Sequence, residues 1–333
     1  MTSILVTGGN GFIGSNFIRF LLKNHTTLGL EDVINLDSRT YSGRGNNLEH
    51  MGLSDHPFYS PIPGDIRDHE AVDFVFASYR PDFVFNFAAE SHVDRSIESS
   101  EQFRTTNFGG VGVLLDASLR YPIQQFVQIS TDEVYGSLEK DSKSSTEDSP
   151  LKPRSPYAAT KAAADLLALS YFHTHGLPVI ITRSSNNYGE YQFPEKIIPK
   201  FITRLIEGKK VPLMWSEENQ GENVRDWLYV QDNCEAIWFA SQKGKPGEIY
   251  NVAGGDERTN IEITRMVLKE FEAGEERIER VPHRKGHDFR YSVDMSKLRK
   301  LGFSNRFSKI DERMTQVCEW YKNNRIWWEP LKQ

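Results

Sequence analysis

Two adjacent carboxylates follow an apolar run in the segment ISTDEVYGS, residues 129–137. In a partly desolvated site, mutual repulsion pushes the pKa values of two carboxyl groups apart, so Asp132 and Glu133 could serve as one acid and one base. Eliminating water requires such a pair, because one group removes a proton from carbon while the other protonates the departing oxygen. A solvated turn is the commoner fate of neighbouring acids. The position of this pair, directly after an expected parallel strand, favours a reactive site.

A tyrosine and a lysine four residues apart form a second reactive pair. Tyr157 and Lys161, in SPYAATKAAAD, lie on one face of an expected helix. The lysine cation lowers the pKa of the phenol, so the tyrosine can take a hydroxyl proton as hydride leaves the same carbon. Ser130 and Thr131 end the preceding strand and can hydrogen-bond that oxygen, which favours a redox site over a surface contact. The expected catalytic residues are Thr131, Asp132, Glu133, Tyr157 and Lys161.

A glycine-rich loop indicates the hydride acceptor. The strand ILVTG runs into Gly8, Gly11 and Gly14, and an amphipathic stretch covers residues 12–23. Glycines let the backbone approach a pyrophosphate, whose charge is met by the free amides at the N-terminus of the helix. Asp37 ends the next apolar run, where a carboxylate can accept from the adenosine ribose and repels a 2′-phosphate. The sequence therefore predicts NAD rather than NADP. The alternative, in which the glycines only form a tight turn and Asp37 only caps the next segment, is less favoured.

Composition limits the classes of function. A chain of 333 residues can bury a sizeable core and form a cleft. A net charge of -6 does not attract polyanions, so we expect no nucleic acid partner. Cys234 and Cys318 lie too far apart for a CxxC pair or a clustered metal site, which predicts a reducing compartment and no metal. Since the N-terminus lacks a basic region and no apolar run reaches membrane-spanning length, we expect a cytoplasmic protein without membrane contact.

The order of the apolar runs predicts the fold that positions these residues. Short apolar runs alternate with longer amphipathic stretches, which is typical of an α/β fold with a Rossmann-type, doubly wound parallel sheet. The expected strands cover residues 4–8, 33–37, 82–89, 126–130, 179–185 and 248–254. The expected helices cover residues 12–23, 111–119, 158–172 and 229–241.

The pattern becomes irregular in the second half of the chain. Prolines and the polar stretch SEENQGEN, residues 216–223, interrupt the alternation. We therefore expect an NAD-binding domain of residues 1–185 and 229–257, with a smaller, discontinuous substrate-binding region of residues 186–228 and 258–333. The polar segment KDSKSSTEDSP is expected to form a surface loop.

The motifs as a set resemble those of a known family. They read VTGGNGFIGSN, LDSRTYSG, GDIRD, NFAAESHVDRSI, ISTDEVYGS, SPYAATKAAAD, RSSNNYGEYQFPEKIIPKFI, VRDWLYVQD, IYNVAGGDERTN and KGHDFRYSVD. This set is similar to that of the extended short-chain dehydrogenase/reductases and, within them, of the dTDP-glucose 4,6-dehydratases, over nearly the whole chain. The resemblance implies retained NAD and conversion of dTDP-glucose to dTDP-4-keto-6-deoxyglucose. It also implies a homodimer formed by helices near residues 108–121 and 157–175.

The resemblance gives each reactive group a role. Tyr157 removes the C4 hydroxyl proton as C4 hydride passes to NAD, Glu133 abstracts the C5 proton, and Asp132 protonates the departing C6 hydroxyl. Hydride then returns to C6 and a proton to C5. The alternatives of the same fold are a UDP-sugar epimerase, decarboxylase or 4,6-dehydratase, and the paired acids argue against the first two. A non-catalytic NAD-binding regulator is a further alternative, which the complete set of catalytic groups opposes.

The resemblance also implies binding residues. For the cofactor they are Gly8, Gly11, Phe12, Ile13, Gly14, Asp37, Ser38, Arg39, Thr40, Asp65, Ile66, Phe87, Ala88, Ala89, Glu90, Ser91, Thr106, Tyr157, Lys161 and Asn187. For the sugar nucleotide they are Ser91, Thr131, Asn186, Lys196, Ile197, Pro212, Leu213, Met214, Arg225, Asn260, His283, Arg284, Lys285, Gly286 and His287. Arg225 has an independent rationale, because its planar fork of donors matches a diphosphate. The chain departs from related sequences in a longer loop, MWSEENQGENVRDW, and in Lys285, so the choice between dTDP and UDP stays open.

Overall fold

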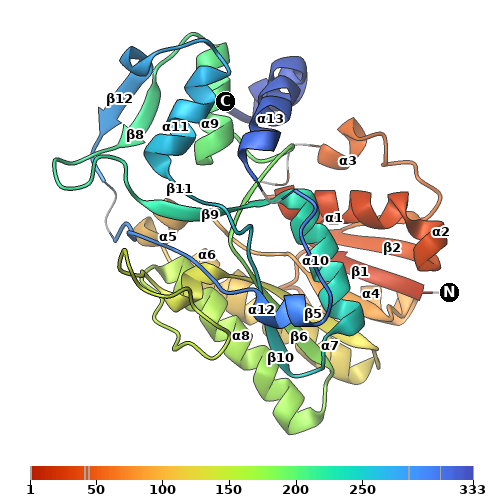
Figure 1. Cartoon of the computed structure of the whole chain (residues 1–333). Coiled ribbons are helices and arrows are strands. Elements are labelled where there is room, and N and C mark those ends of the chain that lie inside the picture. Colours follow the sequence, from red (N-terminus) through yellow and green to blue (C-terminus); the bar gives the residue numbers. More distant parts are fainter. Residues whose placement is uncertain (1, 41–42, 44–45, 284–285, 308, 333) are drawn as a thin grey trace.

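A seven-stranded parallel sheet forms the centre of the described part of the chain, residues 2–40, 43, 46–283, 286–307 and 309–332 of a computed structural model (Figure 1). In spatial order its strands are β10 (Glu248–Val252), β6 (Val179–Ser184), β5 (Gln125–Thr131), β4 (Phe83–Asn86), β1 (Thr2–Thr7), β2 (Leu30–Asp37) and β3 (Tyr59–Pro63). The order runs outward from β1 in both directions, so a crevice forms at the carboxyl ends of β1 and β4, where such sheets bind ligands. The predicted doubly wound sheet is confirmed.

Helices cover both faces of this sheet. On one face lie α4 (His69–Tyr79), α7 (Val111–Arg120) and α8 (Pro156–His175), and on the other lie α1 (Phe12–Lys23) and α10 (Val230–Lys243). Strands such as β1, β2, β4 and β5 contribute to both cores, because successive side chains of a strand point to opposite faces. Leu5 belongs to the first core, while Ile4 and Val6 belong to the second.

A smaller region completes the crevice. Its two short sheets are β11 (Glu257–Thr259) with β9 (Val224–Tyr229) and β7 (Asn186–Tyr188), and β12 (Ile278–Val281) with β8 (Val211–Met214). Around them pack α9 (Ile197–Ile206), α11 (Asn260–Lys269), α13 (Asp311–Asn323) and α14 (Arg325–Trp328). The core of this region is rich in tyrosine and tryptophan, and Phe12 and Met51 from the first half of the chain pack against it. The glycine-rich loop therefore touches the C-terminal part of the molecule.

Short elements link the larger ones. They are α2 (His25–Leu28), α3 (Asn47–His50), α5 (Val93–Glu98), α6 (Glu101–Phe103), the π-helix η2 (Arg104–Gly110), α12 (Ser296–Lys300), and the 3-10 helices η3 (Asp132–Tyr135), η4 (Glu275–Arg277) and η5 (Glu329–Lys332). Among the helices described, none combines the length and the apolar character needed to span a bilayer.

Within the central sheet, β4 and β3 differ most from the sequence-based prediction, and the short strands of the smaller region were not among the predicted strands. β4 ends at Asn86 rather than at residue 89, because residues 87–89 leave the sheet and line a cavity. β3 was not among the predicted strands, since Pro61 and Pro63 obscure its pattern. Proline has no N–H to donate, and β3 tolerates two prolines because it is an edge strand that pairs with β2.

Candidate active site

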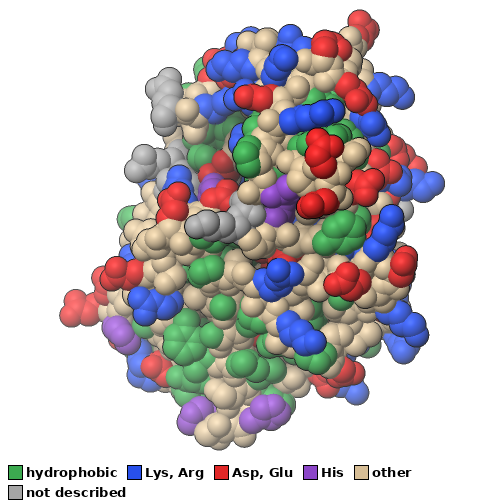
Figure 2. All heavy atoms as spheres, turned by 90° about the vertical axis from the view of Figure 1, so that its left-hand side faces the viewer, with side chains coloured by type: hydrophobic (Ala, Val, Ile, Leu, Met, Phe, Trp, Pro, Cys, Tyr) green, Lys and Arg blue, Asp and Glu red, His purple; other side chains and the backbone are tan. Residues whose placement is uncertain are grey.

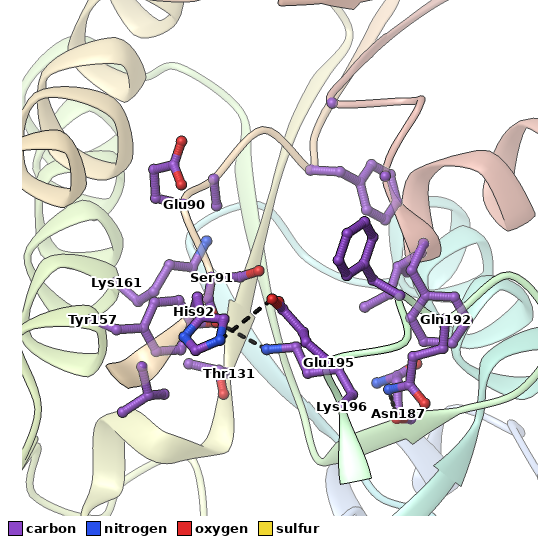
Figure 3. A pocket seen from close by; sticks show the side chains of 18 of the residues that line it. Glu90, Ser91, His92, Thr131, Tyr157, Lys161, Asn187, Gln192, Glu195 and Lys196 are labelled. Carbon is purple, nitrogen blue, oxygen red and sulfur yellow. Dashed lines mark hydrogen bonds and ion pairs between the residues drawn. The ribbon is translucent and has the colours of Figure 1, made fainter. Parts of the chain in front are cut away.

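A cavity of about 540 Å³ opens at the carboxyl ends of the central strands and extends to the smaller region. The residues predicted to be catalytic all line it: Thr131, Asp132, Glu133, Tyr157 and Lys161. Figure 3 shows Tyr157 and Lys161 projecting from α8 beside Thr131. Asn187, Gln192 and Lys196 lie on the opposite side of the same space. A ligand in this cavity can therefore contact both the large sheet and the smaller region.

The end of β5 positions the adjacent acids. The strand ends at Thr131, and η3 begins at Asp132. Thr131 Oγ1 accepts a hydrogen bond from Glu133 N (3.3 Å) and donates one to Asp132 Oδ1 (3.2 Å). The two carboxyl groups enter different surroundings, since Asp132 is 3% exposed whereas Glu133 is half-buried. Neighbours in the sequence thus differ in access to water.

Burial favours the neutral form of Asp132. Desolvation raises the pKa of this carboxyl well above its ordinary value, and the negative charges of Glu133 and Asp226 add to the effect. The Oδ2 atom of Asp132 is buried and has no hydrogen-bond partner among the described residues. A protonated carboxyl group at this position can donate its proton to a ligand in the cavity.

Helix α8 presents the redox pair. Ser155 caps its N-terminus by accepting a hydrogen bond from Ala158 N, and Pro156 occupies the first turn. Lys161 Nζ donates to Ile129 O at 2.5 Å, which ties the helix to β5. Burial lowers the pKa of Lys161 to about 8, although the charge of Asp165 acts in the opposite direction.

The phenol of Tyr157 is harder to ionise than its spacing from Lys161 predicts. Burial raises its pKa above the ordinary value, and the charges of Glu133 and Asp132 raise it further. A hydrogen bond with Thr131 opposes these effects without outweighing them. The expected lowering of this pKa is therefore wrong for the protein alone, because burial of the phenol disfavours its charged form and the acids of η3 add to this effect.

Sequence reasoning missed a buried ion pair beneath the redox pair. Asp165 Oδ2 accepts from Ser130 Oγ and from Arg183 Nε, each at 2.9 Å. Arg183 Nη1 also donates to Tyr135 Oη at 3.0 Å. Asp165 lies one helical turn after Lys161 in SPYAATKAAAD, and this spacing could have indicated a carboxylate next to the lysine. This network connects β5, β6 and α8 directly under the cavity.

The glycine-rich loop fits a dinucleotide. Gly8 has a φ of +69°, and a Cβ atom there would lie 2.6 Å from Ala88 N, so only glycine leaves this space open. Asp37 Oδ2 accepts from Asn10 N at 2.8 Å, and Oδ1 accepts from Arg39 N at 2.6 Å. Burial raises the pKa of Asp37 despite these bonds. The loop and the carboxylate together form the cradle that a pyrophosphate and an adenosine ribose require.

The predicted cofactor residues gather in the same cavity, with one exception. Arg39 is described by the structure and does not line the cavity, although its backbone holds Asp37. Those that line it are Gly8, Gly11, Phe12, Ile13, Gly14, Asp37, Ser38, Thr40, Asp65, Ile66, Phe87, Ala88, Ala89, Glu90, Ser91, Thr106, Tyr157, Lys161 and Asn187.

Most of the predicted sugar-nucleotide residues also line the cavity. They are Ser91, Thr131, Asn186, Lys196, Ile197, Pro212, Leu213, Met214, Arg225, Asn260 and His287. His283 and Gly286 are described but lie outside the lining, and His283 Nδ1 is 2.9 Å from His287 Nδ1. Arg284 and Lys285 lie outside the described residues. Among the described residues, no group of three or more His, Cys, Asp or Glu side chains could hold a metal ion.

Two cations of this set are held by backbone carbonyl groups. Arg225 donates to Val224 O at 2.6 Å and to Asp288 O at 3.0 Å, and its guanidinium lies 4.3 Å from the centre of the Tyr291 ring. Lys196 Nζ donates to Ser91 O at 3.2 Å. Both side chains are thereby oriented at the cavity wall.

A contact across the cavity was not predicted. His92 Nε2 lies 3.3 Å from Glu195 Oε2, as the dashed line in Figure 3 shows. Burial lowers the pKa of His92, although Glu195 opposes this. These residues are far apart in sequence, so only the folded chain reveals the pair.

Comparisons with known proteins agree with this geometry. The sequence matches the profile of the GDP-mannose 4,6 dehydratase family over residues 5–315. It is 48% identical to a dTDP-glucose 4,6-dehydratase of Streptomyces niveus, over 99% of this chain and 95% of the relative. The structure is similar to that of DesIV, a dTDP-glucose 4,6-dehydratase of Streptomyces venezuelae with NAD bound, with a TM-score of 0.93, 44% identity and 99% of both chains covered. A UDP-glucose 4-epimerase of Thermus thermophilus, also in complex with NAD, gives a TM-score of 0.87 at 29% identity, over 97% of this chain and 99% of that one.

Proposed function

Because the chain belongs to the GDP-mannose 4,6 dehydratase family, we propose that it is a dTDP-glucose 4,6-dehydratase, a hydro-lyase that forms dTDP-4-keto-6-deoxyglucose and water. One observation carries this choice among enzymes of the fold: Asp132 and Glu133 line the same cavity as Tyr157 and Lys161. A 4-epimerase needs the redox pair alone, since it returns hydride to the carbon that lost it. A dehydratase also needs an acid and a base for the loss of water.

The cofactor is NAD, as in the similar structures. Gly8 and Gly14 line the cavity, and a Cβ atom at either would clash with the backbone of Ala88 or of Gly8, so glycine is required for this loop conformation. Asp37 would accept from the adenosine ribose and disfavour a 2′-phosphate. When bound, NAD would supply the acceptor for the C4 hydride and its return to C6, with a proton returned to C5. Tyr157 and Lys161 line the cavity where they would hold the nicotinamide ribose.

Tyr157 and Thr131 act on the C4 hydroxyl group. Tyr157 takes the hydroxyl proton, and Thr131 hydrogen-bonds the same oxygen. Both side chains line the cavity and are hydrogen-bonded to each other, which supports a shared substrate oxygen. Burial is the main cause of the raised pKa of the phenol and the charge of Glu133 adds to it, so a positive charge beside Tyr157 is needed before it can accept the proton. Lys161 supplies one such charge below its pKa of about 8.

Glu133 and Asp132 divide the elimination between them. The 4-ketone makes the C5 proton acidic, and Glu133 removes it. A C5–C6 double bond forms as the C6–O bond breaks, and Asp132 gives its proton to the departing hydroxyl, which leaves as water. The raised pKa of Asp132 and its buried Oδ2 support the acid role, while the half-buried Glu133 is the group left to act as base.

The smaller region is proposed to hold the nucleotide. Residues 186–228 and 258–333 contribute Asn186, Lys196 and Arg225 to the cavity wall, and these donors suit a diphosphate in a protein of net charge -6. The remaining residues, 1–185 and 229–257, form the NAD-binding domain of the same proposal.

A comparison of three substrates tests the function. Purified protein is incubated with dTDP-glucose, UDP-glucose or GDP-mannose, and the products are identified by nuclear magnetic resonance. We expect the 4-keto-6-deoxy product, which also absorbs ultraviolet light in alkali, with dTDP-glucose preferred. Formation of a C4 epimer alone would overturn the dehydratase proposal. Turnover of GDP-mannose in preference to dTDP-glucose would overturn the assignment of dTDP-glucose as the substrate.

A homodimer is part of the proposal. Figure 2 shows hydrophobic side chains gathered on the face of the molecule that carries α8. Phe108, Leu119 and Leu166 are exposed on η2, α7 and α8, which pack together. Such a surface suits burial against a second copy. Sedimentation equilibrium should give twice the chain mass.

A cytoplasmic location is also part of the proposal, and the free, buried thiols of Cys234 and Cys318 accord with it.

A further inference from the structure

The C-terminal helices reach the glycine-rich loop. In Figure 1 the dark-blue α13 lies near α3, above the N-terminal end of α1. Trp327, in α14, donates a hydrogen bond from Nε1 to Asn47 Oδ1 at 2.9 Å. The two residues stand at opposite ends of the chain, and both are buried. The second half of the molecule thus contacts the first residue of α3 through one defined bond.

Asn47 passes this contact on to the loop. Its Nδ2 atom donates to Asn10 O and to Ser15 Oγ, each at 3.1 Å. Asn10 lies between Gly9 and Gly11, and its own N–H donates to Asp37 Oδ2 at 2.8 Å. The side-chain oxygen of Asn47 therefore accepts from Trp327, and its side-chain nitrogen donates to the glycine-rich loop and to α1. It is 3% exposed, so each of these bonds replaces water that cannot reach it.

The bonds fix the part of the loop that approaches the pyrophosphate. Gly8 and Gly11 line the cavity on either side of the peptide whose carbonyl group Asn47 holds. A loop with several glycines has many accessible backbone conformations, so an external anchor lowers the entropy that ligand binding would otherwise have to remove. Trp327 and Asn47 supply that anchor from outside the cavity, since neither lines it within the described structure.

We propose that Trp327 and Asn47 are positioning residues that hold the glycine-rich loop closed on NAD and thereby set the rate at which NAD dissociates. The inference rests on the proposed function in one respect: an enzyme that returns the same hydride to its substrate has to retain the cofactor through the cycle. The C-terminal α14 then supports the cofactor site from outside the cavity.

The neighbouring tryptophan provides a matched control. Trp328 is 0% exposed, and its Nε1 donates to Tyr321 O at 2.8 Å, a bond confined to the C-terminal region. Trp327→Phe and Trp328→Phe each remove one buried indole N–H and a similar volume. Both variants should lower the melting temperature. Only Trp327→Phe removes a bond that leads to the loop.

The test measures exchange of bound NAD in the absence of sugar nucleotide. Purified holoenzyme is mixed with excess isotopically labelled NAD, and the bound fraction is followed by rapid gel filtration and mass spectrometry. For Trp327→Phe we expect exchange to be roughly threefold to tenfold faster than in the wild type, the range set by the net worth of one hydrogen bond. Trp328→Phe should exchange at the wild-type rate. Equal rates for the two variants would overturn the proposal.

Asn47→Ala gives a second, independent measurement. It should accelerate exchange at least as much as Trp327→Phe, because it removes both the contact with Trp327 and the contact with the loop. Adding Trp327→Phe to Asn47→Ala should cause little further change, since the two residues act through one connection. Full additivity in the double variant would contradict that connection. If the wild-type protein retained no NAD, the proposed function itself would fail, whereas slow wild-type exchange that Trp327→Phe leaves unaltered would refute the anchor alone.

Discussion

The two ends of the cavity are built in different ways. At the end proposed for the redox chemistry, η3 and α8 hold buried ionisable groups next to β5, and burial shifts the pKa values of Asp132, Tyr157 and Lys161. At the nucleotide end, short strands and loops carry Lys196 and Arg225, and backbone carbonyl groups hold both cations. Burial at the first end shifts the pKa values of the side chains, whereas hydrogen bonds at the second end fix the orientation of the side chains.

This difference follows from what each end has to do. Proton transfer requires groups whose pKa values depart from those in water, and removal of water is the strongest means of shifting them. Recognition of a diphosphate requires cations that keep their charge, and the two cations proposed for this task donate to backbone carbonyl groups of the cavity wall. Variants at the redox end should therefore change rates and pH dependence, and variants at the nucleotide end should change affinity.

Tyr157→Phe should cause the largest loss, because it removes the acceptor of the first proton. We expect turnover to fall by about 10²- to 10⁴-fold, the usual contribution of a positioned acid or base. Bound NADH should not accumulate when substrate is added, as judged by near-ultraviolet absorbance. Accumulation of NADH at the wild-type rate would remove Tyr157 from the oxidation step.

Glu133→Gln should stop the reaction one step later. Product formation should fall within the same range, about 10²- to 10⁴-fold, while oxidation at C4 continues. Substrate should therefore convert bound NAD to NADH that persists. Glu139→Gln, on an exposed residue outside the lining of the cavity, is the control and should behave as the wild type. Normal product formation by Glu133→Gln would contradict its role as base.

Arg225→Lys should change affinity rather than chemistry. Lysine keeps the charge but loses the planar fork, so we expect KM for dTDP-glucose to rise by about 10- to 100-fold with little change in kcat, as for loss of a charged hydrogen bond. Arg258 is the cross-strand neighbour of Arg225 and pairs with Asp256 and Asp311 outside the cavity lining. Arg258→Lys should leave KM unaltered. A fall in kcat alone for Arg225→Lys would place this arginine at the redox end.

Asp165→Asn should have the smallest effect at neutral pH and a distinct effect in alkali. Lys161 loses its proton as pH rises through about 8, so the wild-type rate should fall in that range. Asp165 favours the lysine cation, and its removal should move this fall to lower pH. The rates of the two proteins should converge at pH values where Lys161 is protonated in both.

Ser130→Ala separates charge from structure in this experiment. It removes a hydrogen bond to Asp165 but keeps the carboxylate, so its pH profile should follow that of the wild type. An identical shift of the pH profile in Ser130→Ala and Asp165→Asn would show that the hydrogen-bond network affects Lys161 through packing rather than through the charge of Asp165.

Local patterns in the sequence determined the type and order of the main elements and indicated the members of the proposed reactive set. The alternation of apolar runs predicted the parallel sheet, and the motifs named Thr131, Asp132, Glu133, Tyr157 and Lys161, because strand ends, helix spacing and glycine loops depend on residues close together in the chain. β3 was not among the predicted strands, since its two prolines are tolerated only at a sheet edge, and position in a sheet is a tertiary property.

Only the tertiary structure decided the state of each reactive group. Asp132 and Glu133 are adjacent in sequence, yet one is buried and the other half-buried. The pKa of a carboxyl group depends on the atoms packed around it from other elements, so the raised pKa of Asp132 follows mainly from its burial in the fold. The same holds for the lowered pKa of Lys161, the raised pKa of Tyr157 and the contact between Trp327 and Asn47. Each depends on distances between residues far apart in the chain, which residue types and spacings do not encode.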